Sequence, residues 1–319
     1  MADLLSYDFM VRALLAAALV GVTAPAVGIF LVQRRLALVG DGMGHVALTG
    51  VAVGLLTGSA PVATALVAAV AAAVVIELVR ARGRTSGDVA LAVMFYGGIA
   101  GGVVLVSRSD DGSAATLNSY LFGAITTTSA ADLWVFAALS VVVLATCLLL
   151  ARRLFAVSND EEYARASGLP VLRLNLLLAV LTAVTVVVSM RVVGLLLISA
   201  LMIVPTAAAQ LFCRSFIGTL AAAMGIGTAV SVLGVVTSYY ANTPSGGTIV
   251  LYAIAVFGVV AAGSVVRSRF ARRRHAPAEE HPHEHGPGCG HPPVVHAGHV
   301  DYLHDGHRHA PHGAHYDEH

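Results

Sequence analysis

Residues 36–56 read LALVGDGMGHVALTGVAVGLL, a stretch long enough to cross a bilayer as one helix. Two ionisable residues, Asp41 and His45, lie inside it. Their spacing of four places them on one face of a helix. An ionisable residue within a span costs on the order of 3 kcal/mol on insertion scales, so it is a functional candidate that faces the interior of a helical bundle.

The rest of the composition agrees with a membrane protein. The 319 residues are 57% hydrophobic and 12% charged, with a mean hydropathy of +0.81. The 19 basic and 18 acidic residues nearly balance, so charge predicts neither a nucleic-acid partner nor a membrane-surface binder. All 19 basic residues are Arg, and a Walker-type phosphate loop needs Lys. We therefore expect ATP hydrolysis, if any, on a separate subunit.

Hydropathy predicts an all-helical, polytopic transmembrane bundle of about eight or nine spans. Arg residues follow every odd-numbered span, which predicts an outside N-terminus and a cytoplasmic C-terminus. Small residues recur at helix-packing spacing and predict close helix contacts. The expected spans are 10–33, 36–57, 60–79, 89–107, 132–151, 172–190, 192–212, 216–239 and 248–266.

Residues 269–319 differ in composition from the transmembrane domain expected over residues 1–268. Thirteen of the 14 histidines fall between His275 and His319, among Pro, Gly and acidic residues. Such a composition buries too little apolar surface to fold, so we predict a disordered, His-rich cytoplasmic tail.

Asp41 and His45 together suit a divalent metal, because imidazole favours zinc and a carboxylate oxygen is acceptable to zinc or manganese. Gly40, Gly42 and Gly44 weaken the helix around the pair, and a break there would let carbonyls reach an ion. The alternative is structural: Asp41 pairs with Arg34 or Arg35, and His45 is a satisfied bundle histidine.

The longest loop expected on the cytoplasmic side reads SNDEEYARASGLPVLRLN, residues 158–175. Ser158 or Asp160 can cap a short helix, Gly168 can end it, and Pro170 prevents its continuation. A docking helix and a plain charged surface loop fit this composition equally.

Five motifs in one order carry a resemblance to a known family. They are RRLALVGDGMGHVALTGVAVGLL (34–56), NSYLFG (118–123), DEEYARASGLP (160–170), RVVGLLLISALMIVPTAAA (191–209) and SYYANTPSGGTIVL (238–251). The chain resembles the permease subunits of the bacterial zinc/manganese ABC importers, the ZnuB-like group, over roughly residues 10–268.

The resemblance implies a homodimeric core in the lipid of the cell membrane, a cytoplasmic ATPase on each half, and an extracytoplasmic metal-binding protein that delivers the cation. Asp41 and His45 match the family's metal path. Glu161, Glu162, Ala164 and Gly168 match its ATPase-coupling segment, and Pro205 its interrupted span. The implied function is import of zinc, or alternatively manganese or iron, as cargo, with no permanently bound cofactor and no enzymatic activity of the chain.

The tail lies outside this resemblance and is a metal-binding candidate in its own right. Its clustered imidazoles and Cys289 favour zinc over manganese, and we expect it to capture or sense zinc. The candidate ligands are His281, His283, His285, His307 and His309.

Two functions of other classes remain. An ion-gradient-driven metal carrier would need no ATPase, although a mid-membrane chain of acids or histidines, usual in such carriers, is reduced here to Asp41 and His45. An intramembrane metalloenzyme is disfavoured, because no HExxH or similar three-ligand set occurs in any expected span.

Overall fold

The computed structural model describes residues 6–82, 87–108, 119–123, 129–190, 193–195, 197–273, 290–296, 299–304, 307–312 and 315–318. Two compact units result, Met1–Ala261 and Ala262–His319. The division falls inside one long helix, whereas the sequence places the domain boundary at residue 268.

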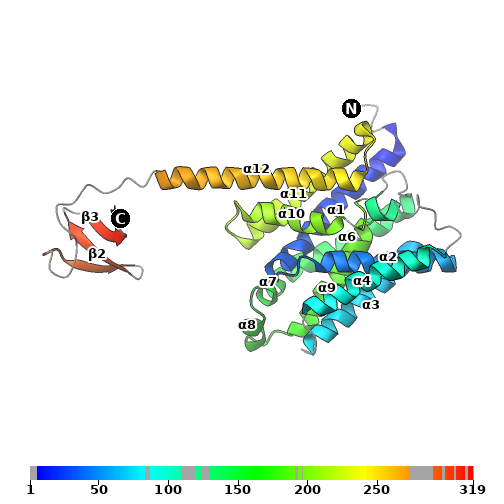
Figure 1. The fold of residues 1–319 in the computed structure, drawn as a ribbon, viewed down its shortest axis with the longest axis horizontal. Helices are drawn as coiled ribbons and strands as arrows, with labels where there is room; N and C mark the ends of the chain where they lie inside the picture. The colour runs from blue at the N-terminus through cyan, green and yellow to red at the C-terminus, as the bar shows by residue number, and fades with distance from the viewer. Residues whose placement is uncertain are drawn as a thin grey trace. The chain divides into compact units, whose positions relative to one another are not determined.

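Helices make up almost all of the first unit, as the sequence predicts (Figure 1). The long helices follow apolar runs, and some begin with ordinary helix signals, such as Pro61 at the first turn of α3 or Ser129 at the N-cap of α6. In order they are α1 (Asp8–Gln33), α2 (Val39–Thr57), α3 (Pro61–Ala81), α4 (Gly87–Val106), α6 (Ala130–Leu149), α7 (Ala151–Asn159), α8 (Glu161–Ala166), α9 (Val171–Ser189), α10 (Ile198–Gln210), α11 (Phe216–Ala241) and α12 (Ser245–Arg273).

Seven of the described helices are long and apolar enough to cross a membrane: α1, α2, α3, α6, α9, α11 and α12. Two of the nine expected spans correspond to shorter apolar helices, Leu91–Val106 and Ile198–Gln210. The span expected at 192–212 is shortened because its first described residues, 193–195 and 197, are not helical. Pro205 does not break α10, which continues through it.

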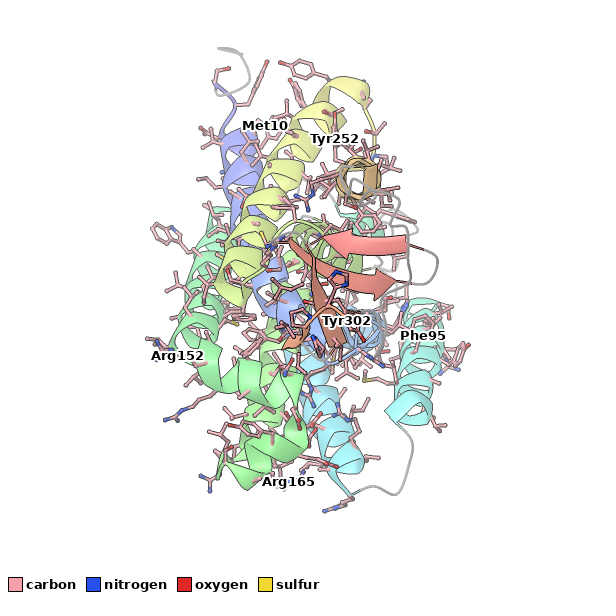
Figure 2. All side chains as sticks on the ribbon, turned by 90° about the vertical axis from the view of Figure 1, so that its left-hand side faces the viewer. Met10, Phe95, Arg152, Arg165, Tyr252 and Tyr302 are labelled. Atoms are coloured by element: carbon pink, nitrogen blue, oxygen red, sulfur yellow. The ribbon has the colours of Figure 1, made fainter. Side chains whose placement is uncertain are left out.

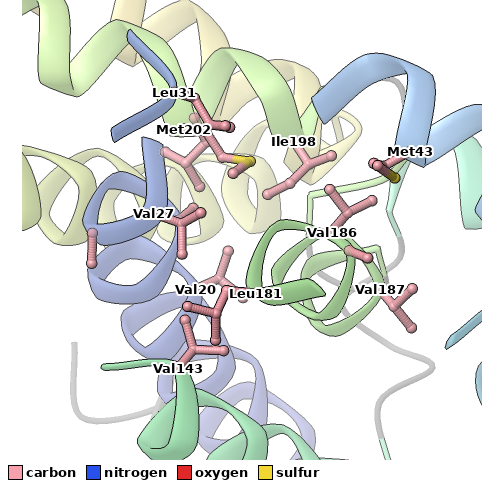
Figure 3. Packing of buried hydrophobic residues seen from close by; sticks show 14 of the residues in the cluster. Val20, Val27, Leu31, Met43, Val143, Leu181, Val186, Val187, Ile198 and Met202 are labelled. Atoms are coloured by element: carbon pink, nitrogen blue, oxygen red, sulfur yellow. The ribbon is translucent and has the colours of Figure 1, made fainter. Parts of the chain in front are cut away.

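The core of the bundle lies where α1, α9 and α10 meet. Val20 and Val27 of α1, Leu181 and Val186 of α9, and Met202 of α10 lie close together in Figure 3 and are almost fully buried. Polar groups in this region are satisfied locally. The hydroxyls of Thr182, Thr185 and Ser189 each donate to the carbonyl four residues earlier, as helix hydroxyls usually do.

The loops that the sequence predicts to be cytoplasmic meet at one end of the bundle. Arg34, after α1, and Arg80, near the end of α3, both pair with Glu161 of α8. Phe216, at the start of α11, packs against Phe30 and Phe155. Figure 2 shows Arg165 at the end opposite Met10 and Tyr252. The exits of the first, third, fifth and seventh expected spans therefore share one side.

The C-terminal unit departs from the prediction of a disordered tail. Four strands form an antiparallel meander, β1 (Pro293–His296), β2 (His299–His304), β3 (His307–His312) and β4 (His315–Glu318), in the order β1-β2-β3-β4. Overall composition missed it because hairpins depend on local sequence, where Asp305-Gly306 is a strong two-residue hairpin signal.

The contact between α1 and α11 gives a test of helix packing. A methyl group at Gly227 would lie 2.3 Å from the carbonyl oxygen of Gly21, whereas one at Gly225 would meet nothing within 4 Å. We expect Gly227→Ala to lower the free energy of unfolding by about 1–3 kcal/mol through overpacking. Gly225→Ala, two residues away on the same helix, should be neutral or stabilising. Thermal unfolding of the detergent-solubilised protein measures both, and equal melting temperatures would contradict the described contact.

Candidate metal path and coupling segment

Asp41 lies in the first turn of α2 and faces α10. Its Oδ1 accepts a hydrogen bond from the hydroxyl of Ser199, near the start of α10. Among the described residues no ion pair joins Asp41 to Arg34 or Arg35, and Arg34 pairs instead with Glu161. The purely structural alternative for this carboxylate, pairing with the neighbouring arginines, is therefore not observed.

His45 lies one turn further along α2, against α4. It is 9% exposed, and its ring meets the ring of Phe95 edge-on, with 4.3 Å between centroids and 74° between planes. The approach of α4 depends on Gly98, where a Cβ would lie 2.6 Å from the carbonyl carbon of His45. Asp41 and His45 thus occupy one face of α2 but contact two different helices.

The glycines predict a break within α2. This prediction is wrong, because α2 is one continuous helix. Gly40, Gly42 and Gly44 serve close packing instead. A Cβ at Gly40 would lie 3.2 Å from the Cβ of Ser199, and one at Gly44 would lie 2.8 Å from the carbonyl oxygen of Leu195. The glycines bring α10 and the segment before it against α2.

The irregular backbone lies across this contact, at residues 193–195 and 197. The Leu195 N–H donates to the carbonyl of Tyr120 at 2.9 Å, outside any helix. Irregular backbone at membrane depth is tolerated only where it is buried in protein or lines a water-filled cavity. Polar backbone groups therefore stand beside the helical turn that joins Asp41 to His45.

Two distant parts of the sequence hold this irregular segment. Gly194 has φ +91° and approaches so closely that a Cβ would lie 2.3 Å from the carbonyl oxygen of Leu121. A Cβ at Gly246 would lie 1.8 Å from the carbonyl oxygen of Val193 and 2.7 Å from that of Phe122. The motifs at 118–123, 191–209 and 238–251 thus form one contact, which fixes the backbone before Ser199.

A charged cluster lies beyond the other end of the path, where α1, α3 and α8 meet. Glu161 Oε2 is 3.8 Å from Arg34 Nη2 and 3.9 Å from Arg80 Nη2, and Arg80 Nη1 is 3.3 Å from Glu77 Oε2. Burial and the nearby Arg80 lower the pKa of Arg34, while Glu77 and Glu161 oppose that shift. The cluster borders a cavity of about 320 Å³ that Met43 of α2 also lines.

The short helix α8 has the form expected of the coupling segment. Asp160 caps it by accepting from the Tyr163 N–H at 2.9 Å, and Gly168, with φ +78°, follows its end. Ala164 is buried and anchors α8, while Glu161 pairs within the chain. Glu162 and Tyr163 are exposed, so these two present the outer surface.

Sequence reasoning missed several residues of these two sites. Ser199 and Phe95 lie in apolar runs in which one more Ser or Phe carries no signal. The sequence does not predict that Arg34 and Arg80 connect α8 to the bundle. Glu77 is paired with Arg80.

The tail candidates belong to the C-terminal unit. His281, His283, His285 and Cys289 lie outside the described residues, and His307 and His309 lie in β3 with side chains that are also outside the description. Among the side chains that the structure describes, no group of three His, Cys, Asp or Glu could hold one ion. Asp41 and His45 are thus a two-residue set, and zinc binding by the tail stays a prediction.

Comparison with known proteins gives consistent matches over the helical unit. Residues 6–263 match the model of the ABC 3 transport family. A Treponema pallidum protein named "Probable metal transport system membrane protein" is 34% identical, covering 81% of this chain and 97% of its own. The manganese transport system membrane protein MntC of Halalkalibacterium halodurans is 32% identical, covering 81% and 88%.

A solved structure resembles the fold as well. It is PsaBC from Streptococcus pneumoniae in complex with Fab, with a TM-score of 0.74, 30% identity, and coverage of 81% of this chain and 93% of the other. The similarity in sequence and the similarity in fold each cover about four-fifths of the chain.

Arg80→Ala tests the charged cluster. The change leaves Glu77, whose side chain is 7% exposed, without its cationic neighbour. Breaking a buried pair costs about 3–5 kcal/mol, and because Arg80 is partly exposed we expect about 2 kcal/mol. Arg165→Ala is the matched control, since that exposed side chain pairs with Glu161 at the surface and should contribute less than about 0.5 kcal/mol. Chemical unfolding in detergent compares them, and similar losses would contradict a structural role for Arg80.

Proposed function

The chain belongs to the ABC 3 transport family, and from this premise we propose that it is the membrane permease subunit of an importer of divalent metal cations. Its seven long apolar helices make it a multi-pass membrane protein. ATP is hydrolysed by a separate subunit, in keeping with a chain that contains no Lys for a phosphate loop.

The observation that carries the proposal is the juxtaposition of Asp41, His45 and the irregular backbone before α10. A carboxylate, an imidazole, the Ser199 hydroxyl and nearby carbonyls are donors that a dehydrating divalent ion needs. Interrupted helices at membrane depth use unwound carbonyls in this way. Few protein ligands give weak binding, which suits passage of the ion.

Manganese and zinc are the two candidate cargoes. Imidazole favours zinc, whereas the oxygen donors around Asp41 suit manganese at least as well. Named relatives such as MntC are manganese transport proteins, which supports the manganese reading. We propose that the path accepts both, with His45 contributing most to any preference for zinc.

The proposed assembly contains two copies of this chain, an ATPase on each, and an extracytoplasmic protein that delivers the metal. The end of the bundle that carries Arg34, Arg80 and α8 faces the cytoplasm in this proposal, because positive loops stay inside. The C-terminal unit then also lies in the cytoplasm of a bacterial cell.

Coupling to the ATPase is proposed to run through α8. Glu162 and Tyr163 offer an exposed acidic and aromatic surface, the kind of anchor that protein interfaces favour. Behind it, Glu161 contacts arginines at the ends of α1 and α3, so a displacement of α8 reaches both helices. In the core α1 packs against α10, and α3 packs against α2.

The path is tested by ATP-dependent manganese uptake into vesicles containing the whole complex, with zinc and iron as competitors. We expect Asp41→Asn and His45→Gln to abolish uptake and Ser199→Ala to reduce it several-fold, because each removes a donor or its positioning contact. His45→Gln should weaken competition by zinc most.

Thr182→Val is the control for these variants, since that buried hydroxyl bonds only within its own helix. It should transport normally. Normal uptake by the Asp41 or His45 variants, with all variants present in the membrane, would reject the path.

The docking surface is tested by copurification of the ATPase subunit. We expect Glu162→Ala with Tyr163→Ala to abolish copurification and ATP-dependent uptake, because the exposed surface of α8 is removed. Tyr240→Ala is the control, a tyrosine that is 63% exposed beside 67% for Tyr163 but lies on α11. Metal uptake that is driven by an ion gradient and needs no ATPase would instead identify the chain as a secondary carrier.

A further inference from the structure

The C-terminal unit contains an eight-residue repeat that transport by the helical unit does not use. Three consecutive blocks read HAGHVDYL (296–303), HDGHRHAP (304–311) and HGAHYDEH (312–319). The first and fourth residues of every block are His, and the sixth is Asp, His and Asp in turn. If only the number of histidines mattered, the sequence would have no reason to keep this eight-residue period.

The register of the sheet turns each repeat into a local cluster. His296 pairs with His299, His304 with His307, and His312 with His315, so the first and fourth residues of each block are direct cross-strand partners. The sixth residue follows the fourth by two along the same strand and therefore shares its face. In every hairpin the three residues occupy one face beside the turn.

We propose that each repeat is a three-ligand site for a zinc-class divalent cation, so that the C-terminal unit binds three ions. The sites are His296, His299 and Asp301; His304, His307 and His309; and His312, His315 and Asp317. Directly opposed residues have Cβ atoms about 4.5–5.5 Å apart, and diagonal ones about 7–8 Å. Three imidazoles, or two imidazoles and a carboxylate, are ligand sets that three-ligand zinc sites in proteins use.

The length of the strands separates neighbouring sites. β2 and β3 each contain six residues, an even number, so the positions at their two ends lie on opposite faces. The second site consequently occupies one face and the first and third occupy the other. β2 pairs with β3 from Tyr302–His309 to His304–His307, at the end that holds the second site.

Burial in the sheet agrees with a metal site at the first repeat. Asp301 is fully buried, although Val295 is 80% exposed and Val300 is 39% exposed. A carboxylate is buried in proteins when it is paired or coordinates a metal. Among the described side chains of the sheet, this carboxylate is thus more deeply buried than Val295 and Val300.

Metal binding also accounts for the mismatch between composition and fold in this unit. A small sheet without an apolar core is marginal in water. Ligand binding free energy becomes folding free energy when the site exists only in the folded state. The three ions therefore stabilise the meander that the apolar residues cannot stabilise.

The first test counts zinc bound to the full-length purified protein, and it reads bound metal rather than transport. We expect His299→Ala, His307→Ala and His315→Ala each to lower the bound zinc by one ion per chain, and the triple variant to lower it by three. Val300→Ala, Arg308→Ala and Tyr316→Ala change the neighbour on the opposite face and should leave the count unchanged. A single substitution that removes more than one ion, or none, would overturn one ion per repeat.

A second measurement needs no variant that could misfold. Arg308 is the one trypsin site among residues 290–319 and lies within β3. We expect zinc, but not manganese, to slow cleavage after Arg308 in the full chain at least tenfold, and the triple variant to lose this protection. An equal rate of cleavage after Arg308 with and without zinc would overturn the proposal. Uptake by the triple variant reports separately on the transport function, which should persist.

Discussion

The helical unit depends on one constraint of the bilayer, which is that a backbone amide or carbonyl within it must find a partner inside the protein. Helices meet this constraint by themselves, but residues 193–195 and 197 are not helical. Their partners come from the 118–123 segment, through the Tyr120 carbonyl, and the close approach of Gly246 keeps lipid away from the same place. The irregular segment is therefore tolerated only because three remote parts of the chain, the segment itself included, meet there.

The nine apolar segments could be read from the sequence, because hydropathy over about 20 residues reports directly on transfer into lipid. The lengths of the helices that these segments form were less predictable. The span expected at 192–212 lost its first turns to contacts with Tyr120 and Gly246, which lie far away in the sequence. Glycines at 40, 42 and 44 indicated a weak helix by propensity, yet close packing with α10 and α4 keeps α2 continuous.

Only part of the candidate site could be predicted from the sequence. A carboxylate and an imidazole among apolar residues stand out by their cost, so Asp41 and His45 could be found. Ser199 could not, since its hydroxyl costs little in a helix and only the packing of α10 brings it to Asp41. Likewise Glu161 looked like a surface acid until the ends of α1 and α3 supplied its arginines.

The two-residue links and six-residue strands of the C-terminal meander have a consequence for how such a segment changes in length. Inserting or deleting eight residues adds or removes one strand and one set of histidines while every remaining pair keeps its register. An insertion of an odd number of residues within a strand would move the ligands that follow to the other face. The proposed metal capacity of this part of the chain would thus grow or shrink in whole steps, without any adjustment of the helices before it.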